Sequence, residues 1–116
     1  MRIHVVAALL VMLLGVHTAY AHAHLDHAVP AVDSTVSPAP KEVSLFFTQN
    51  LEPAFSTVTA RDAAGADVSQ GKAEISGNTM RLPLKSLDPG SFTVHWHAVS
   101  VDTHSTEGTF TFHVGK

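Results

Sequence analysis

The chain has 116 residues, no cysteine, and seven Lys and Arg against ten Asp and Glu, a formal net charge of −3 at pH 7 with histidine neutral. Its length indicates one small domain, its acidic balance argues against nucleic acid as a partner, and its lack of thiols excludes disulfides, thiolate zinc sites and cysteine nucleophiles. Histidine, in contrast, occurs nine times, and it is the commonest side-chain metal ligand.

The first 21 residues have the pattern of a secretory signal peptide. Arg2 supplies a positive charge, residues 5–16 form an apolar run, and Ala19-Tyr20-Ala21 is an A-x-A cleavage site. The run is shorter than the ~20 apolar residues that span a bilayer, which disfavours a membrane anchor. We therefore expect residues 1–21 to be removed, leaving residues 22–116 as an exported domain that does not span the membrane. A cut after Ala23 is the alternative and would leave His24 first.

Residues 22–116 show short strands separated by turns. Strands are expected at residues 23–29, 42–48, 56–61, 73–75, 79–82, 91–99 and 109–114. Turn signals include Gly77-Asn78 and Asp88-Pro89-Gly90. Leu25 is the expected core anchor of the opening strand, and residues 31–41 are expected to form a loop-rich connection. No helical period stands out, so the pattern predicts an all-β domain, a seven-strand immunoglobulin-like β-sandwich.

His22 and the triplet Asp102-Thr103-His104 carry the chemistry that the sequence offers. A histidine at a free N-terminus presents an α-amine and an imidazole, and both lose their protons near neutral pH when a metal competes. Asp102 and His104 lie in the loop between the last two expected strands, and an extended backbone places both on one side. Three nitrogens and one oxygen in a tetragonal arrangement suit Cu(II), whereas zinc prefers a tetrahedron.

A longer pattern surrounds this triplet and extends into the first half of the chain. It reads Phe92-x-Val94-x-Trp96-x-x-Val99-Ser100-x-Asp102-x-His104-x-x-x-Gly108-x-x-x-Phe112-x-Val114. The first half adds His22-x-x-Leu25, Pro30-Ala31, Val43-x-Leu45-x-Phe47, and Glu52 followed by Phe55-Ser56. With these motifs, nearly all of residues 22–116 resembles the CopC family of periplasmic copper-resistance proteins.

The resemblance implies a seven-strand Greek-key sandwich, immunoglobulin-like or cupredoxin-like, that binds Cu(II) in the periplasm. It implies a ligand set of His22 through both nitrogens, Asp102 and His104, which we call the candidate metal site. It also implies a CopD-like inner-membrane protein as a partner, and we expect the domain to be a monomer. The family's leucine at the fourth processed position matches Leu25, which favours cleavage before His22.

The sequence also departs from the family pattern. Many relatives carry a methionine-rich loop for Cu(I), but Met80 is the only methionine after the expected signal peptide. Because Cu(I) favours thioether ligands, we predict no dedicated Cu(I) site. Gln49 stands where many relatives have an acidic residue, which would alter hydrogen bonding around the metal. Phe92 stands where tyrosine is frequent, a small change in packing.

His24 permits a competing arrangement and is otherwise an auxiliary ligand candidate. In His22-Ala23-His24, Cu(II) can be wrapped by the α-amine, two deprotonated amides and the His24 imidazole. This wrap needs the same α-amine as the candidate metal site, and it is disfavoured if a sheet engages the amides. His95 and His97 alternate with Trp96, so they are expected to form an exposed pair on the outer face of the sandwich.

Three functions remain open at this point. The first is a non-enzymatic Cu(II)-binding protein that sequesters or carries copper for resistance and homeostasis. The second is a copper mono-oxygenase-like enzyme, because a terminal histidine resembles the histidine brace of lytic polysaccharide monooxygenases. Asp102 would then occupy a position that oxygen needs. The third is an adhesion or structural sandwich with incidental histidines. We favour the first and expect no catalysis.

Overall fold

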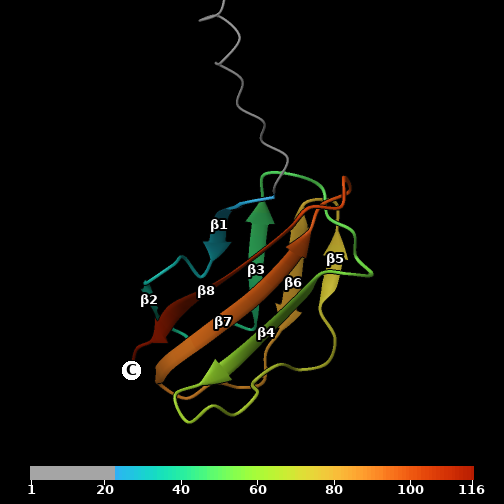
Figure 1. Ribbon diagram of the computed structural model, residues 1–116. Helices are drawn as coiled ribbons and strands as arrows, with labels where there is room; N and C mark the ends of the chain where they lie inside the picture. Colours follow the sequence, from blue (N-terminus) through green and yellow to red (C-terminus); the bar gives the residue numbers. More distant parts are fainter. Residues whose placement is uncertain (1–22) are drawn as a thin grey trace, which may run out of the picture.

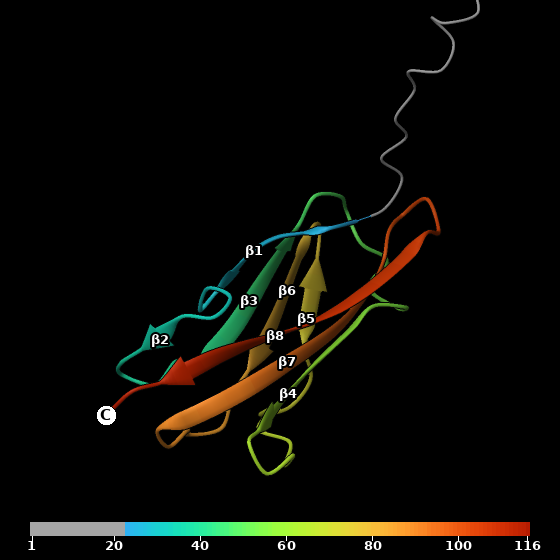
Figure 2. The same ribbon diagram turned by 60° about the vertical axis from the view of Figure 1, so that its left-hand side comes forward.

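The computed structural model describes residues 23–116, which form two stacked four-stranded sheets (Figures 1 and 2). The first sheet has the order β1-β3-β6-β5 and comprises β1 (Leu25–Val29), β3 (Glu42–Phe47), β6 (Thr79–Pro83) and β5 (Glu74–Ser76). The second has the order β2-β8-β7-β4 and comprises β2 (Thr35–Val36), β8 (Ser105–Val114), β7 (Gly90–Val99) and β4 (Thr57–Asp62). The predicted all-β sandwich is confirmed, while the predicted signal peptide and His22 lie outside the described residues.

The largest differences from the predicted strands are an additional strand, β2, and an earlier start of β8. The segment 31–41, expected to be a connection, contains the short strand β2, which pairs in parallel with His113 and Val114 of β8. Strand β8 begins at Ser105 rather than at residue 109, and it continues the antiparallel ladder with β7. Pairing with β7 extends β8 through residues that carry no apolar alternation. Within residues 23–116, no helix has the length and apolar character needed to cross a membrane.

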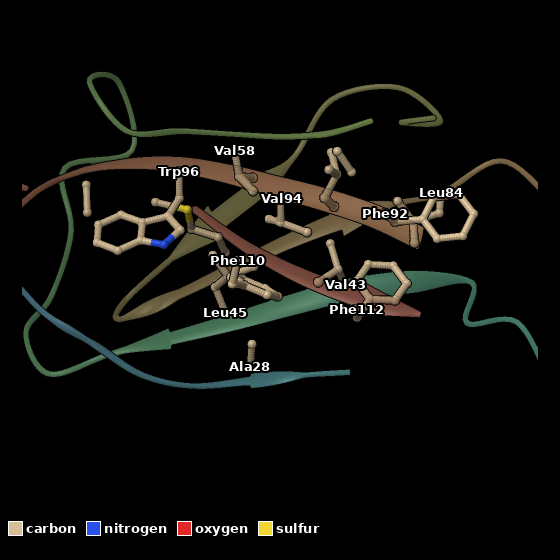
Figure 3. Packing of buried hydrophobic residues seen from close by; sticks show 14 of the residues in the cluster. Ala28, Val43, Leu45, Val58, Leu84, Phe92, Val94, Trp96, Phe110 and Phe112 are labelled. Atoms are coloured by element: carbon tan, nitrogen blue, oxygen red, sulfur yellow. The ribbon is translucent and has the colours of Figure 1, made fainter. Parts of the chain in front are cut away.

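The core lies between the two sheets and consists of the alternating apolar residues of the long strands (Figure 3). Val43, Leu45 and Phe47 of β3 are buried as expected, as are the alternate residues of β7 and β8 that face them. In the opening segment the buried residues are Ala23 and Ala28, whereas Leu25 is only partly buried at the edge of the core. Leu25 pairs with the buried Phe47 and packs against the core, so the expected core contact is present, while the two alanines are the fully buried residues of the segment.

Trp96 packs at the end of the core nearest the β7–β8 connection. Its indole contacts the ring of Phe47 edge-on, with centroids 5.1 Å apart and planes at 73°, a favoured geometry for aromatic pairs. Gly108 lies opposite Trp96 in the β7–β8 ladder. A Cβ atom at Gly108 would lie 2.6 Å from Cζ2 of the indole. Only glycine therefore lets the indole lie flat across β8.

Candidate metal site

Asp102 and His104 lie in the tight connection, residues 100–104, that joins β7 to β8. The Ser100 amide donates to the His104 carbonyl at 2.9 Å, and the Thr103 amide donates to the Ser100 carbonyl at 2.8 Å. Thr103 adopts a φ of 75°, a left-handed conformation that is rare for a β-branched residue. These bonds fix the backbone of the connection and present both candidate ligands at one end of the sandwich.

The Asp102 carboxylate is held by the buried Ser100 and by His104. The Ser100 hydroxyl donates a short hydrogen bond to Asp102 Oδ1, and Asp102 Oδ2 lies 3.4 Å from Nδ1 of His104. The hydrogen bond from Ser100 is the main reason that the pKa of Asp102 is below its usual value, although desolvation opposes it. Both candidate side chains remain about half exposed. Asp102 therefore stays anionic to a lower pH than an ordinary aspartate.

The start of the described chain lies at the same end of the sandwich as this connection (Figures 1 and 2). The Thr106 hydroxyl, near the start of β8, donates to the carbonyl of the buried Ala23 at 2.6 Å. The His24 amide donates to the Thr48 hydroxyl at 2.9 Å, and the Thr48 amide donates back to the His24 carbonyl at 2.9 Å. Ala23 and His24 are thus fastened to the end of the sandwich that carries the β7–β8 connection.

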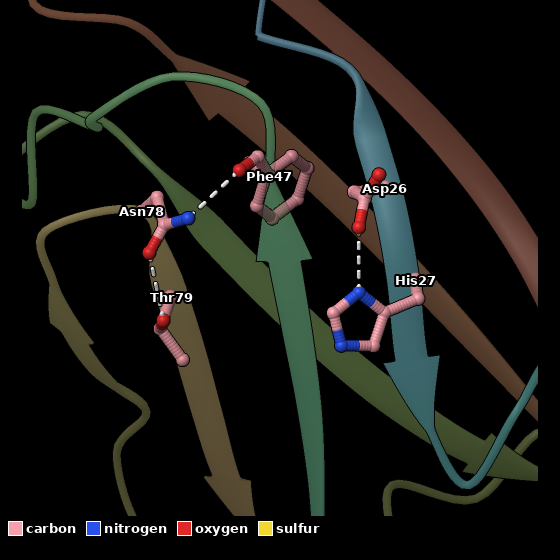
Figure 4. A network of polar contacts seen from close by, with 5 residues as sticks. All are labelled: Asp26, His27, Phe47, Asn78 and Thr79. Atoms are coloured by element: carbon pink, nitrogen blue, oxygen red, sulfur yellow. Dashed lines mark hydrogen bonds and ion pairs between the residues drawn. The ribbon is translucent and has the colours of Figure 1, made fainter.

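The strand end that receives His24 is itself held in place by the β5–β6 turn. Asn78 donates from its side-chain amide to the Phe47 carbonyl at 2.9 Å, as Figure 4 shows, and the Phe47 amide donates to the Asn78 carbonyl at 2.8 Å. Gln49 follows Thr48 directly, and the next residue, Asn50, accepts a bond from the Val101 amide at 3.1 Å. Gln49 therefore lies in a segment that contacts both the N-terminal residues and the β7–β8 connection.

The remaining histidines lie on other surfaces. His27 pairs with Asp26 at 2.7 Å (Figure 4) and stacks on Phe46 with ring centroids 4.4 Å apart. His95 contacts Glu107, and His113 contacts Ser91. No group of three or more His, Asp or Glu side chains is gathered for a metal ion within residues 23–116. Two members of the candidate metal site, Asp102 and His104, lie among the described residues, and their side chains are 3.4 Å apart.

The residues that hold this arrangement carry little signal in the sequence. Ser100 stands within a longer motif, and Thr48 and Thr106 belong to no recognisable motif. A local pattern could not reveal Thr106, because its partner Ala23 lies 83 positions away. Ser100 had one available signal, a hydroxyl two residues before a loop carboxylate, which is a common hydrogen-bonding arrangement in turns.

A two-sheet sandwich with an Asp-x-His connection beside its first strand defines the class of protein. The sequence profile of the CopC domain family matches residues 25–115. Protein YobA of Escherichia coli K12 is 36% identical over 111 residues, covering 92% of this chain and 90% of that protein.

Solved structures agree with the sequence match. The crystal structure of CopC from Methylosinus trichosporium OB3b superposes with a TM-score of 0.74 at 31% identity, covering 80% of this chain and 93% of that one. PcoC, described as a methionine-rich copper resistance protein from Escherichia coli, superposes with a TM-score of 0.71 at 31% identity. The superposition covers 82% of this chain and 100% of PcoC. The chain belongs to the CopC domain family.

Proposed function

We propose that this protein binds Cu(II) in the periplasm and sequesters or carries it for copper resistance, without catalysis. Membership of the CopC domain family supports a role with copper, and PcoC is itself named as a copper resistance protein. The observation that carries the proposal is the Thr106–Ala23 hydrogen bond. It fastens the residue after His22 to the strand that begins directly after His104.

The ligand set proposed is the α-amine and imidazole of His22, the carboxylate of Asp102 and the imidazole of His104. Cleavage after Ala21 would free the amine, and the bond to Ala23 would keep His22 within one residue of the sandwich. The lowered pKa of Asp102 supports this role, because a metal site needs deprotonated ligands. Three nitrogens and one oxygen give the tetragonal set that Cu(II) favours.

Two features support this arrangement over a wrap through His24. The wrap requires the amides of Ala23 and His24 to lose their protons and to bind the metal. The His24 amide donates to Thr48, and Ala23 is fully buried. Both residues would have to leave the sandwich, so the hydrogen bonds and the burial of Ala23 oppose the wrap.

The same ligand set supports binding rather than catalysis. With Asp102 as the fourth ligand, the plane around Cu(II) has no open position for oxygen. Transfer of copper then requires a partner that competes for these ligands, for which a CopD-like inner-membrane protein is proposed. The protein is proposed to act as a monomer.

The test begins with the first residue of the exported protein, determined by mass spectrometry. Cu(II) affinity is then measured by competition with a chelator for the protein starting at His22, for His104→Ala and for the matched control His113→Ala. Loss of a direct ligand should weaken binding by more than the 10–100-fold typical of an outer-shell partner. His113→Ala should bind like the unaltered protein. Equal affinity and identical paramagnetic resonance spectra for all three proteins would refute the proposed site.

A second comparison tests the role of the α-amine. Acetylation of the N-terminus converts the α-amine into an amide, whose nitrogen no longer offers a lone pair to a metal. It leaves the described hydrogen bond of Ala23 in place. Tight binding should be lost while the fold, followed by circular dichroism, is retained. Unchanged affinity after acetylation would exclude His22 as a chelating ligand through its amine.

A further inference from the structure

A second pair of imidazoles lies on the outer face of the sheet that contains β7 and β8. Residues 94, 96 and 98 of β7 point into the core, so His95 and His97 project together from the opposite face. Glu107 of β8 lies directly opposite His97 in the ladder. Its carboxylate Oε2 is 3.0 Å from Nε2 of His95. Two imidazoles and one carboxylate thus share one patch of surface.

The contact between His95 and Glu107 determines which ring nitrogen is free to bind a metal. A carboxylate can only accept hydrogen bonds, so Nε2 of His95 carries the proton in this pair. A neutral His95 ring therefore keeps the lone pair on Nδ1. Metal-binding histidines in proteins usually donate their second ring N–H to a carboxylate, which fixes the ring and raises its basicity. His95 has this arrangement with Glu107.

The spacing of the two histidines suits a shared ion. Positions i and i+2 of a strand lie about 6.6 Å apart along the backbone. Each imidazole is long enough to span half of this separation and still leave bonds of ~2 Å to an ion between them. The His95 and Glu107 side chains are 50% and 65% exposed, so water can reach the ion and complete its coordination.

We propose that His95 and His97 form a second, weaker divalent-metal site on the outer face of β7. It is independent of His22 and needs no free N-terminus. No three protein ligands converge among residues 23–116, so two imidazoles and water form the coordination shell, and Glu107 is a positioning residue for His95. Cu(II) is bound in preference to zinc or nickel, because it heads the divalent affinity order for nitrogen ligands.

The test is a Cu(II) titration of the protein beginning at His22, by equilibrium dialysis and paramagnetic resonance. The unaltered protein should bind two ions, with the second detectable at higher free copper. His97→Ala should bind only one. His113→Ala removes another histidine from the same outer face, where it contacts Ser91, and should still bind two. A second ion that remains with unchanged affinity in His97→Ala, or the absence of any second ion, would overturn the proposal.

Three variants complete the test and separate this proposal from the proposed function. His104→Ala should lose the tight ion and keep the weak one, so failure at either site is recognised without the other. Glu107→Gln should weaken the second site by about 10-fold, the lower end for outer-shell partners, and leave the tight site unchanged. If His27→Ala abolishes the second ion and His97→Ala does not, the site lies elsewhere and the proposal is wrong. Circular dichroism of each variant checks that the sandwich is intact.

Discussion

Gly108→Ala should destabilise the sandwich because the added methyl group has no room. Its Cβ would lie 2.6 Å from Cζ2 and 2.9 Å from Cε2 of Trp96, well inside the ~3.5–4.0 Å at which carbon atoms attract. The indole is only 8% exposed and packs edge-on against Phe47, so it cannot rotate away freely. The strands β7 and β8 must separate, or Trp96 must leave its rotamer.

The size of the effect follows from two opposing contributions. Overpacking of a core costs about 1–3 kcal/mol, while replacing glycine by alanine in an extended strand recovers about 0.5–1 kcal/mol of backbone entropy. The steric cost dominates, and the free energy of unfolding should fall by roughly 0.5–2 kcal/mol. For a domain of this size each kcal/mol lowers Tm by about 4–8 °C, so a loss of several degrees is expected.

Urea denaturation followed by far-ultraviolet circular dichroism measures this change. Gly115→Ala is the matched control, because its nearest contact, Thr35 Cγ2, lies at 3.4 Å and an ordinary Cβ fits there. In a Trp96→Phe background the penalty of Gly108→Ala should shrink, since the six-membered ring of the indole is no longer present. A Gly108→Ala variant as stable as the unaltered protein, or an equal penalty in both backgrounds, would refute this reasoning.

Three further predictions concern the β7–β8 connection and its surroundings. Ser100→Ala should raise the pKa of Asp102 toward its usual value near 3.9, because the Ser100 hydroxyl is the main cause of the lowering. The pKa of Asp102 is lower in the folded chain than in the unfolded chain. Its carboxylate therefore stabilises the fold at pH values above the unfolded pKa, and this contribution is lost as the pH falls through the folded pKa. In the variant the carboxyl should titrate at a higher pH and this contribution to stability should shrink, and an unshifted carboxyl resonance in an NMR titration would contradict this. Thr103→Asn should raise the free energy of unfolding by up to ~1 kcal/mol, because asparagine tolerates the left-handed conformation better; urea denaturation would contradict this if stability fell. Gln49→Glu should tighten Cu(II) binding by about 10-fold through an added carboxylate near the candidate metal site, whereas the distant Gln70→Glu should leave it unchanged in the same competition assay.

The sandwich could be predicted because its long strands repeat an apolar residue at every second position. This alternation correctly placed Phe47, Trp96 and Phe112 in the core. The alternation did not predict strands whose formation depends on a neighbouring strand rather than on their own sequence. Strand β8 begins four residues early because β7 extends it, and β2 forms because β8 offers it a parallel edge.

The candidate metal site also has one part that the sequence predicts and one part that it does not. The Asp-x-His triplet could be recognised locally, and it lies in the β7–β8 connection as predicted. The contacts that bring the first residues to it join positions far apart in the chain, from Thr106 to Ala23 and from Thr48 to His24. A single sequence carries no signal for such pairs. The participation of His22 remains a prediction, because it lies outside the described residues.

Among the described residues, Ala23 is the first whose backbone is hydrogen-bonded to the sandwich, and it directly follows His22 in the sequence. Donor and acceptor of the bonds that Ala23 and His24 make both lie within residues 23–116, so we predict that a chain carrying residues 1–21 keeps them. If His22 binds copper through its amine, only the processed chain binds tightly. A newly made chain would then pass through the cytoplasm without competing for the copper that enzymes need there. If residues 1–21 are a cleaved leader, its removal outside the inner membrane would be the step that turns copper binding on.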